Sequence, residues 1–307
     1  MILCCGEALI DMLPRQTAGG SACFQPFPGG SVFNTAVTLG RLGVPVGLFT
    51  GLSRDLFGAQ LAAYLAESGV DIALAERSDR PTTLAFVTLT DGQARYAFYD
   101  ENTAGRMLAG DALPALPDSV AALFFGGISL MVEPAAGTYE TLLLREAQRR
   151  PVMVDPNIRP GFIGDETAYR ARLDRLLAQA AIVKVSDEDL HWIMGPGTLE
   201  DLAHGLRARG PGIVCVTEGA KGVRAFTASG STSASAQRVE VVDTVGAGDT
   251  FNGAFLAALH RAGALSHAGL ADLSRDRLSD ALGYASRAAA VTVSREGADP
   301  PWERELA

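Results

Sequence analysis

The stretch Asp243–Gly253 reads DTVGAGDTFNG and joins a predicted strand to a predicted helix. A β-branched run at 239–242 precedes it and predicts a strand, and an apolar-periodic helix follows from Asp249. The small residues at 246–248 permit a tight turn whose backbone N–H groups point to one place. Because a helix start adds partial positive charge there, the sequence predicts an anion-binding turn.

Other interpretations of this turn have to be weighed. In an isolated Gly-x-Gly-Asp sequence, the aspartate at the helix start is most often only a cap. A dinucleotide fingerprint would need a third glycine where Phe251 stands, and it would follow the first strand rather than a late one. The chain contains no GxxxxGK[ST] sequence, which excludes a P-loop. Nicotinamide binding is therefore disfavoured, and a phosphate site with a carboxylate base remains.

Composition limits the classes of partner. The 307 residues are 48% hydrophobic and 20% charged, so a large core can form, and the formal net charge is −9. Such an acidic chain is not expected to bind nucleic acid or an anionic membrane. The four cysteines form no CxxC pair, the four histidines give no zinc pattern, and the N-terminus does not read as a signal peptide. We therefore expect a cytoplasmic protein with reduced thiols and no membrane segment.

Short apolar runs alternate with helical patterns along the chain. This alternation predicts an α/β fold with a mostly parallel sheet and helices on both faces, and ligands beyond the carboxyl ends of the strands. The expected strands are 2–5, 46–50, 122–125, 152–155, 182–185 and 213–217, and the expected helices are 31–42, 56–68, 139–149, 167–180 and 199–208.

One segment breaks the alternation. Residues 83–90 and 93–99 flank Asp91-Gly92, a strong type I′ turn signal, and predict a β-hairpin. Residues 12–27 are irregular and can pair with it, so a lid of about 12–27 and 83–100 is expected, serving as cover, oligomer contact or both. A second antiparallel pair, 223–226 with 238–242, is expected around a Ser/Ala/Thr-rich turn at 227–236.

Two long motifs carry a family resemblance. Asp243–Gly253 resembles the C-terminal signature of the ribokinase-like (PfkB) carbohydrate kinases, and Gly29–Gly58 (GGSVFNTAVTLGRLGVPVGLFTGLSRDLFG) resembles their N-terminal signature. The motifs lie far apart, so the resemblance covers essentially the whole chain. It implies a single kinase domain, 1–307, with a ribokinase-like three-layer α/β/α fold, a mostly parallel central sheet and a small β-sheet lid. It also implies ATP and Mg²⁺ as cofactors.

The resemblance assigns the two reacting sides of the site. Asp249 is the expected catalytic base, which accepts the proton of the attacking hydroxyl, and Arg159 is the expected phosphate clamp because a guanidinium is planar and always charged. The anion hole is expected at Gly246, Ala247 and Gly248. The sugar side is expected at Asp11, Gly29, Gly30, Asn34 and Asn157, where a carboxylate such as Asp11 can accept from two hydroxyls.

Nucleotide and ion sites follow from the same resemblance. The segment 184–189 carries Ser186 and Asp189 where other members have Asn-x-x-Glu, so Asp189 is an expected contact of hydrated Mg²⁺. A helix N-cap at Ser186 is an equally good interpretation. Asp243 and the Val245 carbonyl resemble the family's monovalent-cation loop and suggest K⁺. The expected nucleotide contacts are Lys184, Ser186, Thr217, Glu218, Gly219, Gly222, Gly248 and Ala285. Of these, Ala285 lies in an expected late helix around 281–289, whose small side chains should cover the adenine.

The substrate is suggested by residues 98–108 (FYDENTAGRML). This segment, GEALIDML at 6–13 and DPNIRPGFI at 155–163 all resemble bacterial fructokinases. Relatives often carry an arginine where this chain has Asp100, so Arg95 or Arg106 is considered in its place, and Phe98 is expected against the sugar ring. We therefore expect D-fructose to be phosphorylated at its 6-hydroxyl. The family resemblance also implies a homodimer through lid-to-lid contact. A 2-keto-3-deoxygluconate kinase, another sugar kinase and a non-catalytic sugar-binding regulator are the alternatives.

Overall fold

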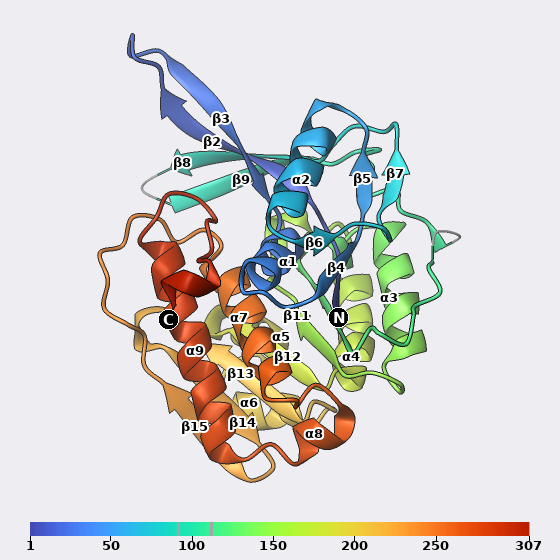
Figure 1. The fold of residues 1–307 in the computed structure, drawn as a ribbon, viewed down its shortest axis with the longest axis vertical. Coiled ribbons are helices and arrows are strands. Elements are labelled where there is room, and N and C mark those ends of the chain that lie inside the picture. The colour runs from blue at the N-terminus through green and yellow to red at the C-terminus, as the bar shows by residue number, and fades with distance from the viewer. Residues whose placement is uncertain (91–92, 111–112, 307) are drawn as a thin grey trace.

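The computed structural model describes residues 1–90, 93–110 and 113–306, and the side chains of 89–96 lie outside that description. Its centre is a nine-stranded sheet in the order β15-β14-β13-β12-β11-β10-β1-β4-β6 (Figure 1). Strands β13 to β6 in this order are parallel, and β14 and β15 are antiparallel additions. The strands are β1 (Ile2–Cys5), β4 (Val46–Phe49), β6 (Val70–Asp71), β10 (Ala122–Gly126), β11 (Val152–Asp155), β12 (Ile182–Ser186), β13 (Ile213–Thr217), β14 (Val223–Thr227) and β15 (Gly230–Ala234).

Helices cover both faces of this sheet because its strands are apolar on both sides. In β1, Ile2 and Cys4 pack in the core beneath α1, α7 and α9, whereas Leu3 and Cys5 pack in the core beneath α3 to α6. The helices are α1 (Ser31–Arg41), α2 (Leu56–Glu67), α3 (Ala135–Glu146), α4 (Glu166–Gln179), α5 (Asp187–Met194), α6 (Leu199–Arg207), α7 (Ala247–Arg261), α8 (His267–Ala271) and α9 (Arg275–Val293). The predicted three-layer α/β/α class is confirmed.

A separate four-stranded sheet stands at one end of the molecule, where β2 and β3 extend beyond the body (Figure 1). Its order is β3-β2-β8-β9, from β2 (Leu9–Gln16), β3 (Ala22–Gly29), β8 (Leu84–Thr90) and β9 (Gln93–Tyr99). The residues predicted as irregular at 12–27 are thus a regular hairpin, joined in parallel to β8. The predicted Asp91-Gly92 turn lies outside the described residues. A two-stranded sheet of β5 (Gly51–Ser53) and β7 (Glu76–Ser78) completes the strands.

The predicted strand at 238–242 is wrong. Strand β14 pairs instead with β15, which lies inside the Ser/Ala/Thr-rich stretch, and residues 235–241 have no regular structure. The physical reason is that Gly230, at φ 122°, closes a tight turn directly after β14. The short polar side chains after it suit a half-exposed edge strand. The β-branched residues Val241 and Val242 are 62% and 54% exposed, so they lacked the partner strand that their propensity anticipated.

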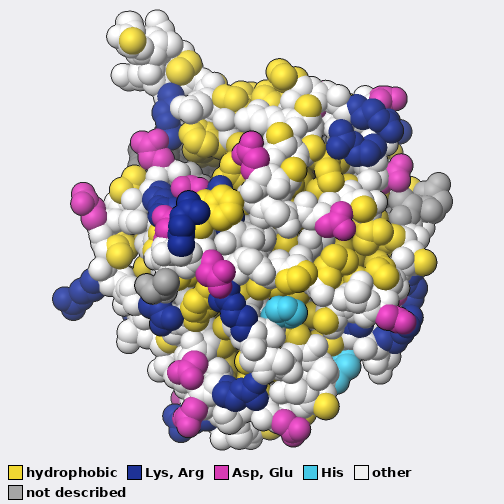
Figure 2. Space-filling view, viewed as in Figure 1, with side chains coloured by type: hydrophobic (Ala, Val, Ile, Leu, Met, Phe, Trp, Pro, Cys, Tyr) yellow, Lys and Arg dark blue, Asp and Glu magenta, His cyan; other side chains and the backbone are white. Residues whose placement is uncertain are grey.

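Figure 2 shows acidic and basic side chains interspersed over one face of the molecule. In the parts of the chain that the structure describes, no helix is both long and apolar enough to cross a bilayer.

Candidate active site

A cavity of about 650 Å³ lies between the carboxyl ends of the central strands and the small sheet. The two predicted signatures meet there, since Gly30, Ser31 and Asn34 from the start of α1 face Gly248 and Asp249 from the start of α7. The small sheet contributes Leu9, Asp11, Leu13, Pro14, Arg15, Val87 and Phe98 to the wall. The cavity therefore brings together the predicted anion-binding turn and residues of the predicted sugar side.

Asp249 is held at both carboxylate oxygens. The Ser31 hydroxyl donates to Oδ1 at 2.7 Å, and the Asn34 amide donates to Oδ2 at 2.9 Å. The residue is 8% exposed, and burial raises its pKa, while the hydrogen bonds from Asn34 and Ser31 act to lower it. Two fixed donors leave the carboxylate one orientation, and each oxygen keeps a lone pair for an attacking hydroxyl. Such an arrangement suits a general base, and that role for Asp249 stays a prediction.

The start of α7 is an open cluster of backbone donors. Gly246 is the N-cap at φ 77°, and no side chain caps the helix. A Cβ on Gly246 would lie 2.5 Å from the Ala298 Cβ, so both the left-handed backbone and the close tail require glycine. The first-turn N–H groups have no partner within the helix. Gly246 and Gly248 line the cavity beside Asp249, where a negatively charged ligand would accept from backbone N–H groups, whereas the Ala247 N–H donates to the Thr244 carbonyl at 3.4 Å.

A buried charge cluster lies behind this turn. Lys184 Nζ is 2.8 Å from Asp155 Oδ2, and Asn252 Nδ2 donates to the same oxygen at 2.7 Å. Lys184 lines the cavity, whereas Asp155 and Asn252 are 0% exposed. Asp155 therefore does not line the cavity, although it ends β11 at the sheet edge where ligands of such sheets bind. A Cβ on Gly248 would lie 3.0 Å from Lys184 Nζ, so the ammonium adjoins the helix start.

The glycine pair Gly29-Gly30 before α1 leaves room for the Asp11 carboxylate and the Glu7 backbone. A Cβ on Gly29 would lie 2.1 Å from Asp11 Oδ2, so a larger residue would displace that carboxylate. Gly30 has φ 104° and adjoins the Glu7 backbone. Burial, followed by the charges of Asp249 and Glu7, raises the pKa of Asp11 to about 7, and Arg159 opposes that rise. Asp11 lines the cavity, and its predicted contact with the sugar stays a prediction.

The loop after β11 places Asn157 and Arg159 on the cavity wall. Asn157 adopts φ 42°, and its N–H donates to Asp155 Oδ1 at 3.2 Å. Asp189 Oδ1 accepts from the Ile158 N–H at 3.2 Å, and Ser186 caps α5 by accepting from the Asp189 N–H at 2.9 Å. Burial, then the charge of Asp155, raises the pKa of Asp189 to about 6. The cap interpretation of Ser186 is thus confirmed, and Asp189 fixes the loop that carries Arg159.

Sequence analysis missed Glu7 and Ser31. Glu7 is 7% exposed, its Oε1 accepts from the Ser31 N–H at 3.0 Å, and its Oε2 accepts from the Ser129 N–H at 3.2 Å. It therefore ties the start of α1 to the turn after β10, and burial raises its pKa. Both residues stand inside the motifs GEALIDML and GGSVFN, but a single sequence does not show which neighbours they contact in the fold.

Residues 1–305 match the pfkB family carbohydrate kinases. The chain belongs to this family. A fructokinase of Rhizobium leguminosarum bv. trifolii is 49% identical over 278 residues, which cover 91% of this chain and 85% of the relative. The structure of a fructokinase with bound ATP from Xylella fastidiosa has a TM-score of 0.89 at 28% identity, covering 99% of this chain and 97% of that one. An aminoimidazole riboside kinase from Salmonella enterica has a TM-score of 0.86 at 26% identity, with 99% and 97% covered.

This pfkB-family kinase is therefore a phosphotransferase with a sugar acceptor, as the two signatures predicted. The loop at 217–222, which was predicted to bind the nucleotide, does not line the cavity beside Asp249. Glu218 pairs with Arg224 at 2.7 Å, and the Thr217 hydroxyl donates to the Val185 carbonyl at 3.4 Å. Gly219 and Gly222 both have positive φ, and a Cβ on Gly222 would lie 2.2 Å from the Ala234 carbonyl. The loop is thus built for backbone shape, and its binding role stays a prediction.

Ala285 requires a correction. The prediction placed its side chain against adenine, but Ala285 is 0% exposed and packs in the core beneath α9. The prediction failed because helix periodicity alone did not determine which face of α9 turns toward the sheet.

Asp243 ties its loop to the C-terminal tail. Its Oδ1 accepts from the Val245 N–H at 3.0 Å and its Oδ2 accepts from the Gly297 N–H at 3.0 Å. The side chain therefore orients the loop, and any ion held there would depend mainly on backbone carbonyls such as that of Val245.

Asp100 is a buried anchor of the small sheet. It is 5% exposed, and its Oδ1 accepts from the hydroxyls of Thr83 at 2.6 Å and Thr103 at 2.9 Å. Arg106 lies 3.8 Å from its Oδ2 and donates to the Glu133 carbonyl at 3.3 Å. Asp100 does not line the cavity, so it does not replace the arginine that relatives often carry at this position as a sugar contact.

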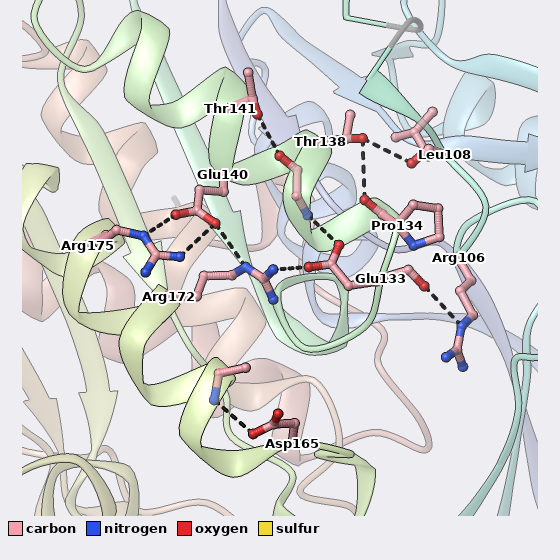
Figure 3. A network of polar contacts seen from close by, with 12 residues as sticks. Arg106, Leu108, Glu133, Pro134, Thr138, Glu140, Thr141, Asp165, Arg172 and Arg175 are labelled. Carbon is pink, nitrogen blue, oxygen red and sulfur yellow. Dashed lines mark hydrogen bonds and ion pairs between the residues drawn. The ribbon is translucent and has the colours of Figure 1, made fainter.

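The network continues from Arg106 into the body of the protein. Figure 3 shows Glu133 paired with Arg172, which also reaches Glu140 at 3.1 Å, so the loop, α3 and α4 are joined. Phe98 does line the cavity, with its ring 4.5 Å from that of Phe162. The Arg95 side chain lies outside the described residues.

Proposed function

We propose that this protein transfers the γ-phosphoryl group of ATP to the 6-hydroxyl of D-fructose, giving fructose 6-phosphate and ADP. The observation that carries the proposal is the doubly held carboxylate of Asp249 at the uncapped start of α7. The choice of fructose and of ATP is supported by the relatives, of which one is a fructokinase at 49% identity and another a fructokinase with bound ATP.

In the proposed reaction Asp249 accepts the proton of the sugar hydroxyl. The hydroxyl oxygen forms a bond to the γ-phosphorus as the bond to the β,γ-bridging oxygen breaks, and ADP leaves with that electron pair. Backbone N–H groups at Gly246, Ala247 and Gly248 receive the charge on the transferred group. Arg159 and Lys184, both on the cavity wall, add positive charge. Asp11 and Asn34 would orient the sugar, and Phe98 would cover an apolar face of its ring.

Mg²⁺ fits this site as a companion of ATP rather than as a resident ion. Among the described residues, no group of three His, Cys, Asp or Glu side chains could hold a metal. Mg²⁺ usually keeps several waters and binds one or two carboxylates plus substrate phosphates. One oxygen of Asp189 accepts from the Ile158 N–H, and the other can accept from a water that coordinates the ion. The ion would neutralise phosphate charge, and K⁺ is proposed at the loop of Asp243 and Val245.

We propose a homodimer through the outer face of the small sheet. In its strand register, Phe24, Phe86 and Tyr99 share the face opposite Asp11 and Phe98. Their rings pack edge to face, with centroids 4.9 Å and 5.3 Å apart, and Tyr99 is 64% exposed. A Phe24→Glu change should halve the mass in sedimentation. An unchanged mass would exclude this face as the dimer contact.

The four free cysteines support a location in the reducing cytoplasm.

A sugar panel tests the proposed function. Purified protein, ATP and Mg²⁺ are offered fructose, glucose, 2-keto-3-deoxygluconate and a nucleoside, with and without K⁺, and ADP release is measured. The proposal expects the highest kcat/KM with fructose, a product identified as the 6-phosphate, and loss of activity in Asp249→Asn. Preference for 2-keto-3-deoxygluconate would move the substrate within the family. No turnover of any sugar, together with tight sugar binding, would favour the non-catalytic regulator.

A further inference from the structure

Lys184 occupies a position that the sheet would otherwise fill with an apolar side chain. It lies in β12 between Val183 and Val185, which face the other layer, and its neighbour on β13 is the buried Cys215. Lys184 is 5% exposed and lines the cavity. Lysine is almost never buried without a partner or a task. Its partner is Asp155, and the pair lies directly behind the start of α7.

Asn252 gives this pair a third member. It lies one turn beyond Gly248 on α7, so both residues share a helix face. Its amide donates to the same Asp155 oxygen that binds the ammonium, at 2.7 Å. In this orientation Asn252 Oδ1 is buried and has no partner within the described structure. A buried amide oxygen without a donor costs free energy, so the orientation of the Asn252 amide is explained by its hydrogen bond to the Asp155 carboxylate.

We propose that Asp155 and Asn252 are positioning residues that hold the Lys184 ammonium against the start of α7, where it donates to the phosphoryl group in transfer. The proposal rests on the proposed kinase reaction. It also accounts for Gly248, because a Cβ there would lie 3.0 Å from Lys184 Nζ, in the space between the ammonium and the first-turn N–H groups.

The charges around Lys184 decide its protonation state. Asp155 faces it from β11, Asp189 from α5 and Asp249 from α7, and the thiol of Cys215 adjoins it on β13. Burial alone lowers the pKa of Lys184, but these carboxylates, Asp155 foremost, hold the pKa above its usual range. If Asp155 became neutral, burial would meet less opposition and the ammonium would lose its proton at lower pH.

The test compares four variants with the wild type across pH 6 to 9. Lys184→Met should lower kcat by about 10²–10³-fold, the usual effect of removing one donor to a developing charge. In Asp155→Asn, kcat should fall as pH rises, with the alkaline limb at lower pH than in the wild type. Asn252→Leu should shift that limb in the same direction by less. The double variant Asp155→Asn/Lys184→Met should be no slower than Lys184→Met, since residues that act as one unit are not additive.

Glu146→Gln is the matched control. Glu146, the last residue of α3, and Arg150, just beyond that helix, form a similarly buried ion pair away from the cavity, with side chains 3% and 6% exposed. This control should lose stability yet keep the wild-type pH profile of kcat. It therefore separates the loss of a buried ion pair from the loss of a positioned ammonium. Should Asp155→Asn fail to fold, Asn252→Leu carries the same prediction without removing a charge.

A binding measurement separates this proposal from the proposed function. The affinity for the ATP analogue AMP-PNP with Mg²⁺, measured by calorimetry, should fall with rising pH in Asp155→Asn and stay level in the wild type. This arm needs no turnover, so it remains decisive even if fructose is not the substrate. A wild-type pH profile in Asp155→Asn, additive losses in the double variant, or full activity in Lys184→Met would each overturn the proposal.

Discussion

Replacing Gly253 with alanine tests whether the separation of α1 and α7 places the base. Gly253 lies inside α7, one turn beyond Asp249, and is buried against α1. An alanine Cβ there would lie 2.6 Å from the Thr38 Cβ and 2.9 Å from the Thr35 carbonyl oxygen. Distances below 3.0 Å force a shift, and a backbone carbonyl cannot turn aside as a flexible side chain can. The two helices must therefore move apart.

The size of the effect follows from opposing terms. Alanine improves a helix interior by about 1 kcal/mol over glycine, while overpacking a core costs about 1–3 kcal/mol, so the net loss of stability is at most about 2 kcal/mol. Activity should suffer more. The Ser31–Asp249 bond of 2.7 Å spans the same two helices, and a displacement of roughly 1 Å at a reacting group can cost about 100-fold in rate.

Gly283→Ala is the control. It lies inside α9, where an added Cβ would meet only the end of the Arg287 side chain, at 3.9 Å. This variant should gain about 1 kcal/mol by helix propensity and keep its kcat/KM. Urea unfolding gives the stabilities, and ADP release with fructose gives the rates. A Gly253→Ala enzyme with the kcat/KM of the wild type would refute the idea that helix separation positions the base.

Three further outcomes are expected. Asp249→Asn should lower kcat by about 10²–10⁴-fold. Because burial raises the pKa of Asp249, the folded state binds this proton more tightly than the unfolded state, and the residue's contribution to stability falls as pH rises from the unfolded-state pKa through the folded-state pKa. Urea unfolding of the variant should therefore depend less on pH than that of the wild type. Ser31→Ala removes a bond that lowers the same pKa, so the acidic limb of kcat/KM should move to higher pH, and an unmoved limb would contradict the assigned contact. Asp100→Ala leaves two buried hydroxyls without their acceptor, which should cost about 1–3 kcal/mol in unfolding and raise the sugar KM more than it lowers kcat. Equal effects on KM and kcat would show that Asp100 does more than anchor the small sheet.

The strands and helices of the body could be predicted because their signals are local. A buried parallel strand is a short apolar run, and an amphipathic helix repeats its apolar residues every three or four positions. Those patterns predicted β1, β4 and β10 to β13 within a residue or two. They failed at 238–242, where the β-branched residues had the propensity for a strand but no partner, and at Ala285, where the helix was recognised but not the face it buries.

The sequence by itself determined the chemistry at each end of the site: a glycine turn followed by Asp249, and a glycine pair followed by Asn34. These depend on backbone conformations that few residues adopt, so they are visible as motifs. Only the tertiary structure decided which residues serve them. Asp249 meets Ser31 from 218 positions away, and Asp155 meets Asn252 from 97. Such contacts arise where the carboxyl ends of separate strands converge with two helix starts. Their partners are chosen by the packing of α1 against α7, which no local pattern records.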